Sequence, residues 1–443
     1  MLLIGNGKLL TRDKNGAYFE NGAVLCDGRL IKAVGETASL RQLYPQAEFL
    51  DARGGVIMPG LINAHSHIYS AFARGLSING YNPTNFYEIL DGMWWNIDRH
   101  LDVEGTRYSA YQTYIDSIKN GVTTLYDHHA SYGEIEGSLF AIAEVAKELG
   151  VRTCLCYEVS DRDGEEKCAA AIKENADFIR YAQKDDTDML KGMFGLHAAF
   201  TLSDKTLEKC VAEKPAGAGF HIHVAEGMND VYDSLQNYGK RTVHRLHDMG
   251  ILGEKTIAGH CIHMSPAEMD LLKATDTMVV NNPESNMSNA VGCSPVLQMY
   301  AKGILLGLGT DAYTNDMIES LKAANCIQKH NACLPNVGWA EVTSMLFDGN
   351  RKIGARAFKT PIGVLEPGAA ADVAVFDYKT YTPFGSFNAD GHIMFGMCGK
   401  QCIHTVANGR VLMKDRELLC CDEENINAKT LELTTRLWKQ LNG

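Results

Sequence analysis

Two histidines, His65 and His67, are the first residues of this chain that could do chemistry together. They follow an apolar run over residues 56–62, and a single serine separates them. Side chains alternate between the two faces of a strand, so both imidazoles point the same way and can share one metal ion. This pattern predicts a metalloenzyme.

Apolar strands alternate with amphipathic helices from residue 56 onward. One helical unit runs from Leu139 to Leu149 and ends at Gly150. The candidate strands are residues 56–62, 122–127, 151–157, 193–197, 220–224, 256–260, 278–281 and 305–310. Strands separated by helix-length segments in this way predict a parallel, TIM-like (β/α)8 barrel of the α/β class.

The two ends of the chain have a different texture, with short apolar runs and turn-forming pairs. Asn21-Gly22 and Asp27-Gly28 predict hairpins near the N-terminus. We therefore expect residues 1–55 and 361–443 to form one small β-sandwich domain from both termini. Residues 56–360 are expected to form the barrel.

In such barrels the active site lies at the C-terminal ends of the strands. The polar residues at or just beyond the predicted strand ends are His65, His67, Asp127, His128, His129, His197, His223, Glu226, His260 and Asp311. We expect these side chains to meet at one rim of the barrel.

The composition limits the kinds of partner that we expect for this protein. The net charge is -12 and no basic stripe is present, which argues against nucleic acid and favours a small-molecule substrate. No signal-like segment or membrane-length apolar run is found, so we expect no membrane association. The 13 cysteines lack zinc-finger spacing, which is typical of reduced thiols and predicts a cytoplasmic protein.

Several motifs in order resemble the amidohydrolase superfamily. They are His65-Ser66-His67, His221-Ile222-His223-Val224-Ala225-Glu226 and Gly307-Leu308-Gly309-Thr310-Asp311, with Gly363-Val364-Leu365 and Gly368-Ala369-Ala370-Ala371-Asp372 beyond the barrel. The chain is most similar to the metal-dependent aminohydrolases and chlorohydrolases of the ATZ/TRZ-like branch. Within that branch it looks closest to the SsnA-type aminohydrolases.

The resemblance implies that His65, His67, His223 and Asp311 hold one divalent metal ion. The family ligand is the histidine three residues before the glutamate, which selects His223, whereas strand alternation alone does not separate it from His221. Imidazoles with a carboxylate suit Zn2+, or alternatively Fe2+, better than magnesium. Relatives with two metals use a lysine at the end of the fourth strand. This strand ends in His197, so we expect a single ion.

The resemblance also implies a mechanism. The metal lowers the pKa of its water and so creates a hydroxide nucleophile. Asp311 takes the proton of this water, and Glu226 passes a proton to the substrate from a partly desolvated pocket. His260 is expected to stabilise the tetrahedral intermediate, and His197 to contact the substrate ring.

Other residues are candidates for substrate contact. Asp127-His128-His129 resembles a segment that borders the ligand pocket in related hydrolases, although a polar strand end that caps the next helix explains it too. Arg162 offers a bidentate partner for an oxo or carboxylate group, against the alternative of a solvated turn. Trp95 offers a stacking face after the first barrel strand, and Asn286 a polar contact.

The leading functional interpretation is a metal-dependent aminohydrolase that deaminates a nitrogen heterocycle, such as an oxopurine of purine metabolism. One alternative is hydrolytic ring opening of a cyclic amide, as in imidazolonepropionase-like relatives, which releases no ammonia. A catalytically silent metal-binding protein is the alternative of another class. By analogy with relatives, we expect a homo-oligomer, a dimer or larger.

Overall fold

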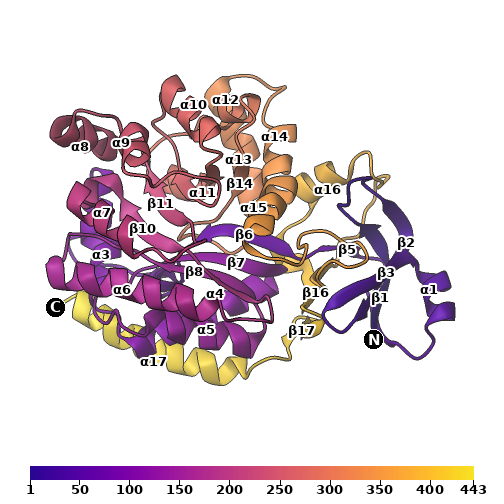
Figure 1. Ribbon diagram of the computed structural model, residues 1–443. Helices are drawn as coiled ribbons and strands as arrows, with labels where there is room; N and C mark the ends of the chain where they lie inside the picture. Colours follow the sequence, from indigo (N-terminus) through magenta and orange to yellow (C-terminus); the bar gives the residue numbers. More distant parts are fainter.

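The computed structural model describes the whole chain, residues 1–443, and divides it into a barrel and a separate sheet built from both termini (Figure 1). The strands of this terminal sheet are β1 (Leu2–Leu10), β2 (Tyr18–Asp27), β3 (Leu30–Glu36), β4 (Glu48–Asp51), β5 (Val56–Pro59), β15 (Val373–Phe376), β16 (Cys402–Ala407), β17 (Arg410–Lys414) and β18 (Glu417–Leu418). Their order is β18-β17-β16-β15-β5-β1-β2-β3, with β4 paired to β1. The predicted union of the two termini is confirmed, while the division at residues 55/56 and 360/361 stays a prediction.

One predicted hairpin turn in this sheet is wrong. Asn21-Gly22 does not interrupt the strand but lies inside β2, where Gly22 faces Gly7 of β1 at a register shift. A Cβ atom on Gly22 would lie 2.4 Å from the Cβ of Leu9. The glycine is therefore needed for the close approach of two strands and not for a turn. The turn at Asp27-Gly28 is present between β2 and β3.

The first predicted barrel strand is divided at Gly60. β5 belongs to the terminal sheet, and the next strand enters the barrel. The barrel strands are β6 (Leu61–Ser66), β7 (Val122–His129), β8 (Arg152–Tyr157), β9 (Leu190–Gly192), β10 (Phe194–Ala198), β11 (Phe220–Val224), β12 (Ile257–His260), β13 (Met278–Asn281) and β14 (Leu306–Leu308). All are paired in parallel, in the sheets β6-β7-β8-β9 and β10-β11-β12-β13-β14. The predicted α/β class with parallel strands is confirmed.

The two sheets meet at two places, which we call seams: β6 lies beside β14, and β8 lies beside β10. A buried asparagine lies at each seam. At the β6–β14 seam, Asn350 donates to the carbonyls of Ile62 and Leu308 and accepts from the Leu308 N–H. At the β8–β10 seam, Asn175 accepts from the N–H groups of Tyr157 and Gly195. Since backbone groups buried at these edges need partners, each amide replaces ladder bonds that the strands do not make with each other.

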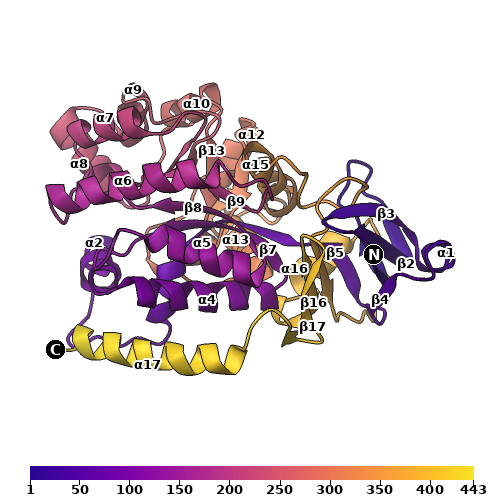
Figure 2. The same cartoon turned by 60° about the horizontal axis from the view of Figure 1, so that its bottom comes forward.

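Helices surround the barrel (Figures 1 and 2). They are α4 (Val103–Lys119), α5 (Ser138–Leu149), α6 (Glu165–Ala182), α7 (Asp204–Glu213), α8 (Met228–Tyr238), α9 (Thr242–Asp248), α10 (Pro266–Ala274), α11 (Pro283–Ser288), α12 (Val296–Ala301), α13 (Met317–Ala332), α14 (Ala340–Ser344) and α15 (Asn350–Ala357), with the short η3 (Ala199–Thr201) and the π-helical η4 (Met345–Gly349). The predicted helix over residues 139–149 is α5, and Gly150 caps it with a φ of 84°. No helix is long and apolar enough to cross a membrane.

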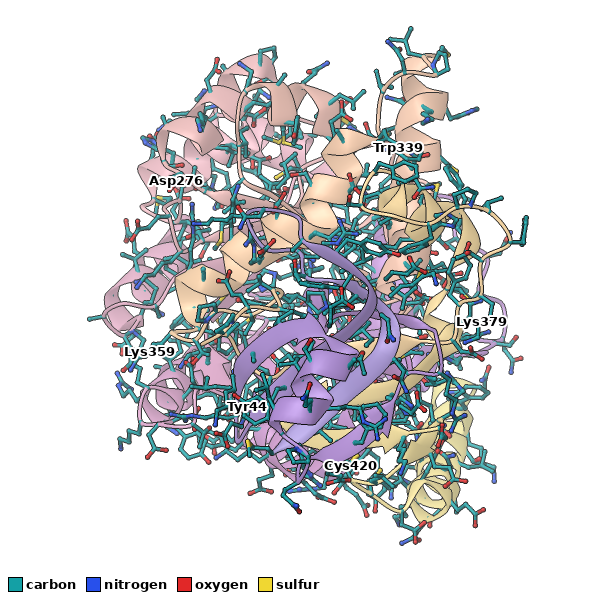
Figure 3. The ribbon with its side chains drawn as sticks, turned by 90° about the vertical axis from the view of Figure 1, so that its right-hand side faces the viewer. Tyr44, Asp276, Trp339, Lys359, Lys379 and Cys420 are labelled. Atoms are coloured by element: carbon teal, nitrogen blue, oxygen red, sulfur yellow. The ribbon has the colours of Figure 1, made fainter.

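The remaining helices precede α4 or belong to the terminal segments. They are α1 (Thr37–Leu43), η1 (Ile68–Ala73), α2 (Phe86–Ile89), the π-helical η2 (Leu90–Trp94), α3 (Trp95–Arg99), α16 (Ala389–Gly396), η5 (Gly399–Gln401) and α17 (Glu423–Leu441). Figure 3 views the molecule from the side of the terminal sheet, with Tyr44 at the end of α1. The C-terminal helix α17 returns to the barrel along α4 (Figure 2). Its Trp438 donates to the carbonyl of Phe72 and so holds η1, which directly follows His67.

Candidate active site

Ring nitrogens and a carboxylate from four strands converge at one rim of the barrel. The Nε2 atom of His67 lies 2.8 Å from Asp311 Oδ1 and 3.2 Å from His223 Nε2. His65, His223, His260 and Asp311 also offer ligand atoms that all lie within 4.8 Å of one another. The structure thus brings together the four residues that were predicted as metal ligands, with His260 beside them.

The hydrogen bonds fix which ring nitrogen faces this centre. His67 Nδ1 donates to the carbonyl of His128 and His223 Nδ1 to that of His197, over 2.6 and 2.9 Å. His260 Nδ1 lies 2.8 Å from Asn286 Oδ1. With Nδ1 occupied as a donor, each neutral ring presents the lone pair of Nε2, which is the arrangement of imidazoles that bind metal.

His65 and His221 show why the two candidate histidines of β11 differ. His65 Nδ1 is 2.8 Å from His221 Nε2, so His221 lies behind His65 and holds its ring. His65 Nε2 is buried and has no hydrogen-bond partner. An orphaned buried nitrogen that faces a carboxylate and other imidazoles fits a bound cation, because it would otherwise be costly to desolvate.

Strained backbone helps to aim these side chains. Asp311 and His260 have φ angles of 55° and 65°, which is the left-handed region that residues with a Cβ rarely adopt. The N–H groups of Thr310 and Asp311 both donate to the carbonyl of His65 over 3.0 Å. Gly309 permits this approach, since a Cβ atom there would lie 2.8 Å from the same carbonyl oxygen.

Burial and neighbouring charge give His65, His67 and Asp311 different protonation states. Burial lowers the pKa of His65 to about 3 despite the nearby Asp311. Burial also opposes the cation of His67, but the charge of Asp311 outweighs it and raises the pKa of His67 to about 9. Burial raises the pKa of Asp311, and the positive charge of His67 outweighs this and holds it well below its usual range. Without a bound cation, the cluster therefore holds its positive charge as a proton on His67.

Glu226 lies at the edge of the cluster. Its Oε2 is 3.6 Å from His260 Nε2. Burial raises the pKa of Glu226 to about 7, against the charge of His260. A carboxyl group whose pKa lies near neutrality in a desolvated pocket can both give and take a proton.

A small cavity of about 30 Å³ lies over the cluster. Its lining includes His67, His197, His223, Glu226, His260 and Asp311, together with Tyr69, Phe86, Leu90, Trp94 and Trp95. Four of these aromatic and apolar side chains come from α2, η2 and α3, which we call the lid (residues 86–99). A larger cavity of about 460 Å³ adjoins it and shares His67, Trp94, Asp311 and Ala312.

Other predicted contact residues lie behind the cavity lining. Asp127 accepts from the N–H of Ile68 over 2.6 Å, and His128 Nε2 donates to the carbonyls of Leu196 and His221. His129 is fully buried, with neither ring nitrogen hydrogen-bonded. Trp95, by contrast, does line the cavity, edge-on to His197 at a ring separation of 5.8 Å.

Arg162 and Asn286 are committed to protein partners. The Arg162 guanidinium pairs with the buried carboxylate of Asp98 in the lid and with Asp163. Asn286 contacts the ring of His260. In this structure the two side chains hold the lid and a site histidine, and their contacts with a substrate stay a prediction.

The sequence interpretation missed two acidic residues near the cluster. Glu158 directly follows β8 and lines the cavity. Asp98, which has no accessible surface, ties the lid to Arg162. The rule applied to other strand ends also points to Glu158, because it is the first polar residue after the predicted strand 151–157.

Comparison with known proteins now places the chain. The model of the Amidohydrolase family matches residues 56–412. The chain belongs to the amidohydrolase family. A second, short match to an imidazolonepropionase-like composite domain of bacteria covers residues 22–47. That segment lies in the terminal sheet, so it does not bear on the site.

Relatives within the family cover nearly the whole chain. A 5'-deoxyadenosine deaminase of Methanosarcina barkeri is 29% identical and covers 100% of this chain and 99% of its own. An adenosine deaminase of Xanthomonas campestris with bound zinc has the same fold, with a TM-score of 0.87, 22% identity and 98% of each chain covered. The atrazine chlorohydrolase TrzN of Arthrobacter aurescens, complexed with zinc, has a TM-score of 0.83 at 21% identity, with 98% of this chain and 100% of its own covered.

The two solved structures confirm the predicted fold, and the family match confirms the resemblance to the amidohydrolases. The relatives also confirm the enzyme class. The chain is a hydrolase that acts on carbon–nitrogen bonds other than peptide bonds, and its full-length relatives include deaminases. Its cluster of histidines with Asp311 could hold a metal ion.

Proposed function

We propose that this aminohydrolase removes the exocyclic amino group of a purine carried on a nucleoside, with one divalent cation held by His65, His67, His223 and Asp311. The observation that carries the proposal is the convergence of Nε2 lone pairs and the Asp311 carboxylate beside Glu226. The deoxyadenosine deaminase relative, which aligns over the full chain, supports a 6-aminopurine nucleoside over the oxopurine considered above.

The donor set supports zinc, with Fe2+ as the alternative. Imidazole nitrogens with one carboxylate are borderline ligands that suit both ions. When bound, the cation lowers the pKa of water toward neutrality and so supplies the nucleophile. A single ion is supported by Lys191, which pairs with Asp188 over 2.7 Å and does not enter the cluster.

The residues of the chain would then move the protons of the reaction. Asp311 accepts the proton that the attacking water loses, and the hydroxyl of Ser285 donates to its Oδ2. Glu226 donates its proton to the ring nitrogen, takes the proton of the added hydroxyl group and passes it to the leaving amino group. The proton held by Asp311 then returns to Glu226, so that water and the amine become a ring carbonyl and ammonia. His260 Nε2 lies 3.6 Å from Glu226 Oε2, and when Nε2 also carries a proton this ring can stabilise the oxyanion that develops on the attacking oxygen.

Residues outside the cavity lining would position those inside it. Asp127 holds the start of η1 next to His67, and Asn286 orients the His260 ring. The His128 carbonyl fixes the tautomer of His67. We assign these groups to positioning because each already has a protein partner.

A homo-oligomer, a dimer or larger, and a cytoplasmic location remain proposals. Large exposed aromatic side chains between α14 and α16 support self-association. Tyr381 is 99% and Phe387 80% exposed, and Trp339 packs on Phe395 at a ring separation of 5.7 Å.

A substrate panel tests the proposal. Purified, zinc-loaded protein is incubated with adenosine, 5'-deoxyadenosine, adenine, guanine and 8-oxoguanine, and ammonia is measured. We expect ammonia from the 6-aminopurine nucleosides. Ammonia from guanine or 8-oxoguanine alone would move the substrate to the oxopurines. Hydrolysis of a cyclic amide without ammonia, in a parallel reaction, would favour ring opening.

A further inference from the structure

Glu158 is a buried carboxylate in the cavity to which the proposed reaction gives no role. Its side chain is 3% exposed and lines the same cavity as Glu226 and Trp95. Within the protein its carboxylate oxygens accept no hydrogen bond, and its nearest cationic neighbour, the guanidinium of Arg162, is 4.0 Å away. Buried carboxylates normally have donors, so this group calls for a ligand.

The neighbouring imidazoles do not supply that donor. His128 Nδ1 is 3.5 Å from Glu158 Oε2, but this ring donates through Nε2 to two carbonyls, and its Nδ1 has no hydrogen-bond partner. Arg162 is already paired with Asp98 and Asp163. The protein therefore leaves the carboxylate open toward the cavity.

His197 adds a second acceptor. The hydroxyl of Thr201 donates to the carbonyl of Ala198, so it must accept the hydrogen on His197 Nδ1, which is 2.7 Å away. The lone pair of this ring is then on Nε2, and it lies 3.9 Å from Glu158 Oε1. Two acceptors at this separation each reach hydrogen-bond distance of about 2.9 Å to one donor atom placed between them.

We propose that Glu158 and His197 form a paired acceptor that binds a hydrogen-bond donor of the substrate other than the amino group that is hydrolysed. This inference rests on the proposed function. The donor is an amino or N–H group on the ring, or a hydroxyl of the attached sugar. A ligand whose matching edge carries only lone pairs would face two acceptors and bind poorly.

A second metal ion is the competing occupant. Glu158 and His197 can join His223 around a cation. His223 Nε2 also faces His67, however, and one ring nitrogen cannot serve two ions. With His223 in the first site, only two protein ligands remain, which is fewer than zinc sites use.

Equilibrium binding and activity together test the inference. Zinc-loaded wild type, Glu158→Gln and Glu158→Ala are titrated with purine riboside, which lacks the hydrolysed amino group. The same proteins are titrated with its 2'-deoxy, 3'-deoxy and 5'-deoxy forms and with 2-aminopurine riboside. Binding is followed by calorimetry, and zinc content and thermal unfolding are measured on each variant. Glu165→Gln is the matched control, because its side chain is 92% exposed.

We expect both Glu158 variants to bind zinc normally and to lose roughly tenfold to a hundredfold in affinity for ligands that carry the donor. A ligand whose affinity is unchanged by the substitution lacks the donor. Comparison of the ligands therefore identifies whether the donor is a ring group or a hydroxyl. An equal loss for every ligand, or no loss, would overturn the assignment. So would two zinc ions per chain in the wild type that fall to one in Glu158→Gln.

The two proposals fail in different ways. If the wild type releases ammonia but the Glu158 substitutions do not weaken binding of any particular ligand group, only the paired acceptor is refuted. If no aminated heterocycle yields ammonia, the proposed function itself is refuted.

Discussion

The Nε2 atoms of His67 and His223 face each other across 3.2 Å, and the Nδ1 atom of each ring donates to a backbone carbonyl. In two neutral rings this geometry would direct lone pairs at each other. The arrangement is stable only when a proton or a cation lies between them. The strand ends therefore create a site that needs positive charge before any substrate binds.

Metal binding should stabilise the fold. Removal of the ion with a chelator should lower the unfolding temperature, and zinc should restore it, because an ion at 100 times its Kd stabilises the native state by about 2.7 kcal/mol. His223→Ala and Asp311→Ala should each reduce zinc content, measured by elemental analysis. Asp311→Ala should also lower the rate, so a fully active variant would remove Asp311 from the mechanism.

Glu226→Gln should retain zinc and lose turnover. The side chain is not among the clustered ligands, and loss of a general acid costs a factor of roughly 100 or more. Burial raises the pKa of Glu226 to about 7, so the protonated donor disappears as the pH rises through this value. A bound cation can only move this limb to lower pH.

The pH profile of kcat/KM measures this limb. It should fall at high pH in the wild type and lack that limb in Glu226→Gln. Glu213→Gln on the exposed end of α7 is the control. Normal turnover in Glu226→Gln, or an unchanged limb, would contradict the role.

The positions of the site residues followed from local patterns, whereas their partners did not. His65, His197, His223 and His260 each end or follow a short apolar strand, and a barrel brings all such ends to one rim. Sequence alternation could not separate His221 from His223, since the difference lies in which of them His65 contacts.

Long-range contacts explain the remaining differences. The solvated turn considered for Arg162 became a buried ion pair with Asp98, 64 positions away, because the lid folds back over the barrel. Asn21-Gly22 has the composition of a turn, yet the approach of Leu9 on the neighbouring strand decides its role. Neither contact leaves a local signature in the sequence.

The two seam asparagines should have different effects on metal binding. Asn350→Ala and Asn175→Ala each leave buried backbone groups without partners, at a cost of roughly 1–3 kcal/mol per group. Only the Asn350 seam carries His65 and Asp311, so zinc affinity should fall in Asn350→Ala and stay near the wild-type value in Asn175→Ala. Urea unfolding and zinc titration measure both effects. Equal zinc affinities in the two variants would show that the contacts of Asn350 do not affect the metal site.

The buried pair of Asp98 and Arg162 should act as a latch on the lid. Arg162→Ala leaves Asp98 buried without its partner, which costs roughly 3–5 kcal/mol. The double variant Asp98→Ala/Arg162→Ala should be destabilised by less than the sum of the single variants, as urea unfolding can measure. Arg99→Ala is the control, because Arg99 pairs with Asp163 while 34% exposed and should cost less than about 1 kcal/mol. Additive effects of Asp98 and Arg162 would refute the latch.

The lid must move before a substrate can bind. The cavity of about 30 Å³ holds no more than a few waters, while ligand sites usually measure about 300–1,000 Å³. Trp94 lies between this cavity and its neighbour of about 460 Å³, so displacement of the lid would join them into a space of suitable size. Hydrogen exchange of residues 86–99 should therefore be fast in the free enzyme and slow when purine riboside is bound, with α5 as an unchanged reference. Equal protection of the lid in both states would show that the substrate enters by another route.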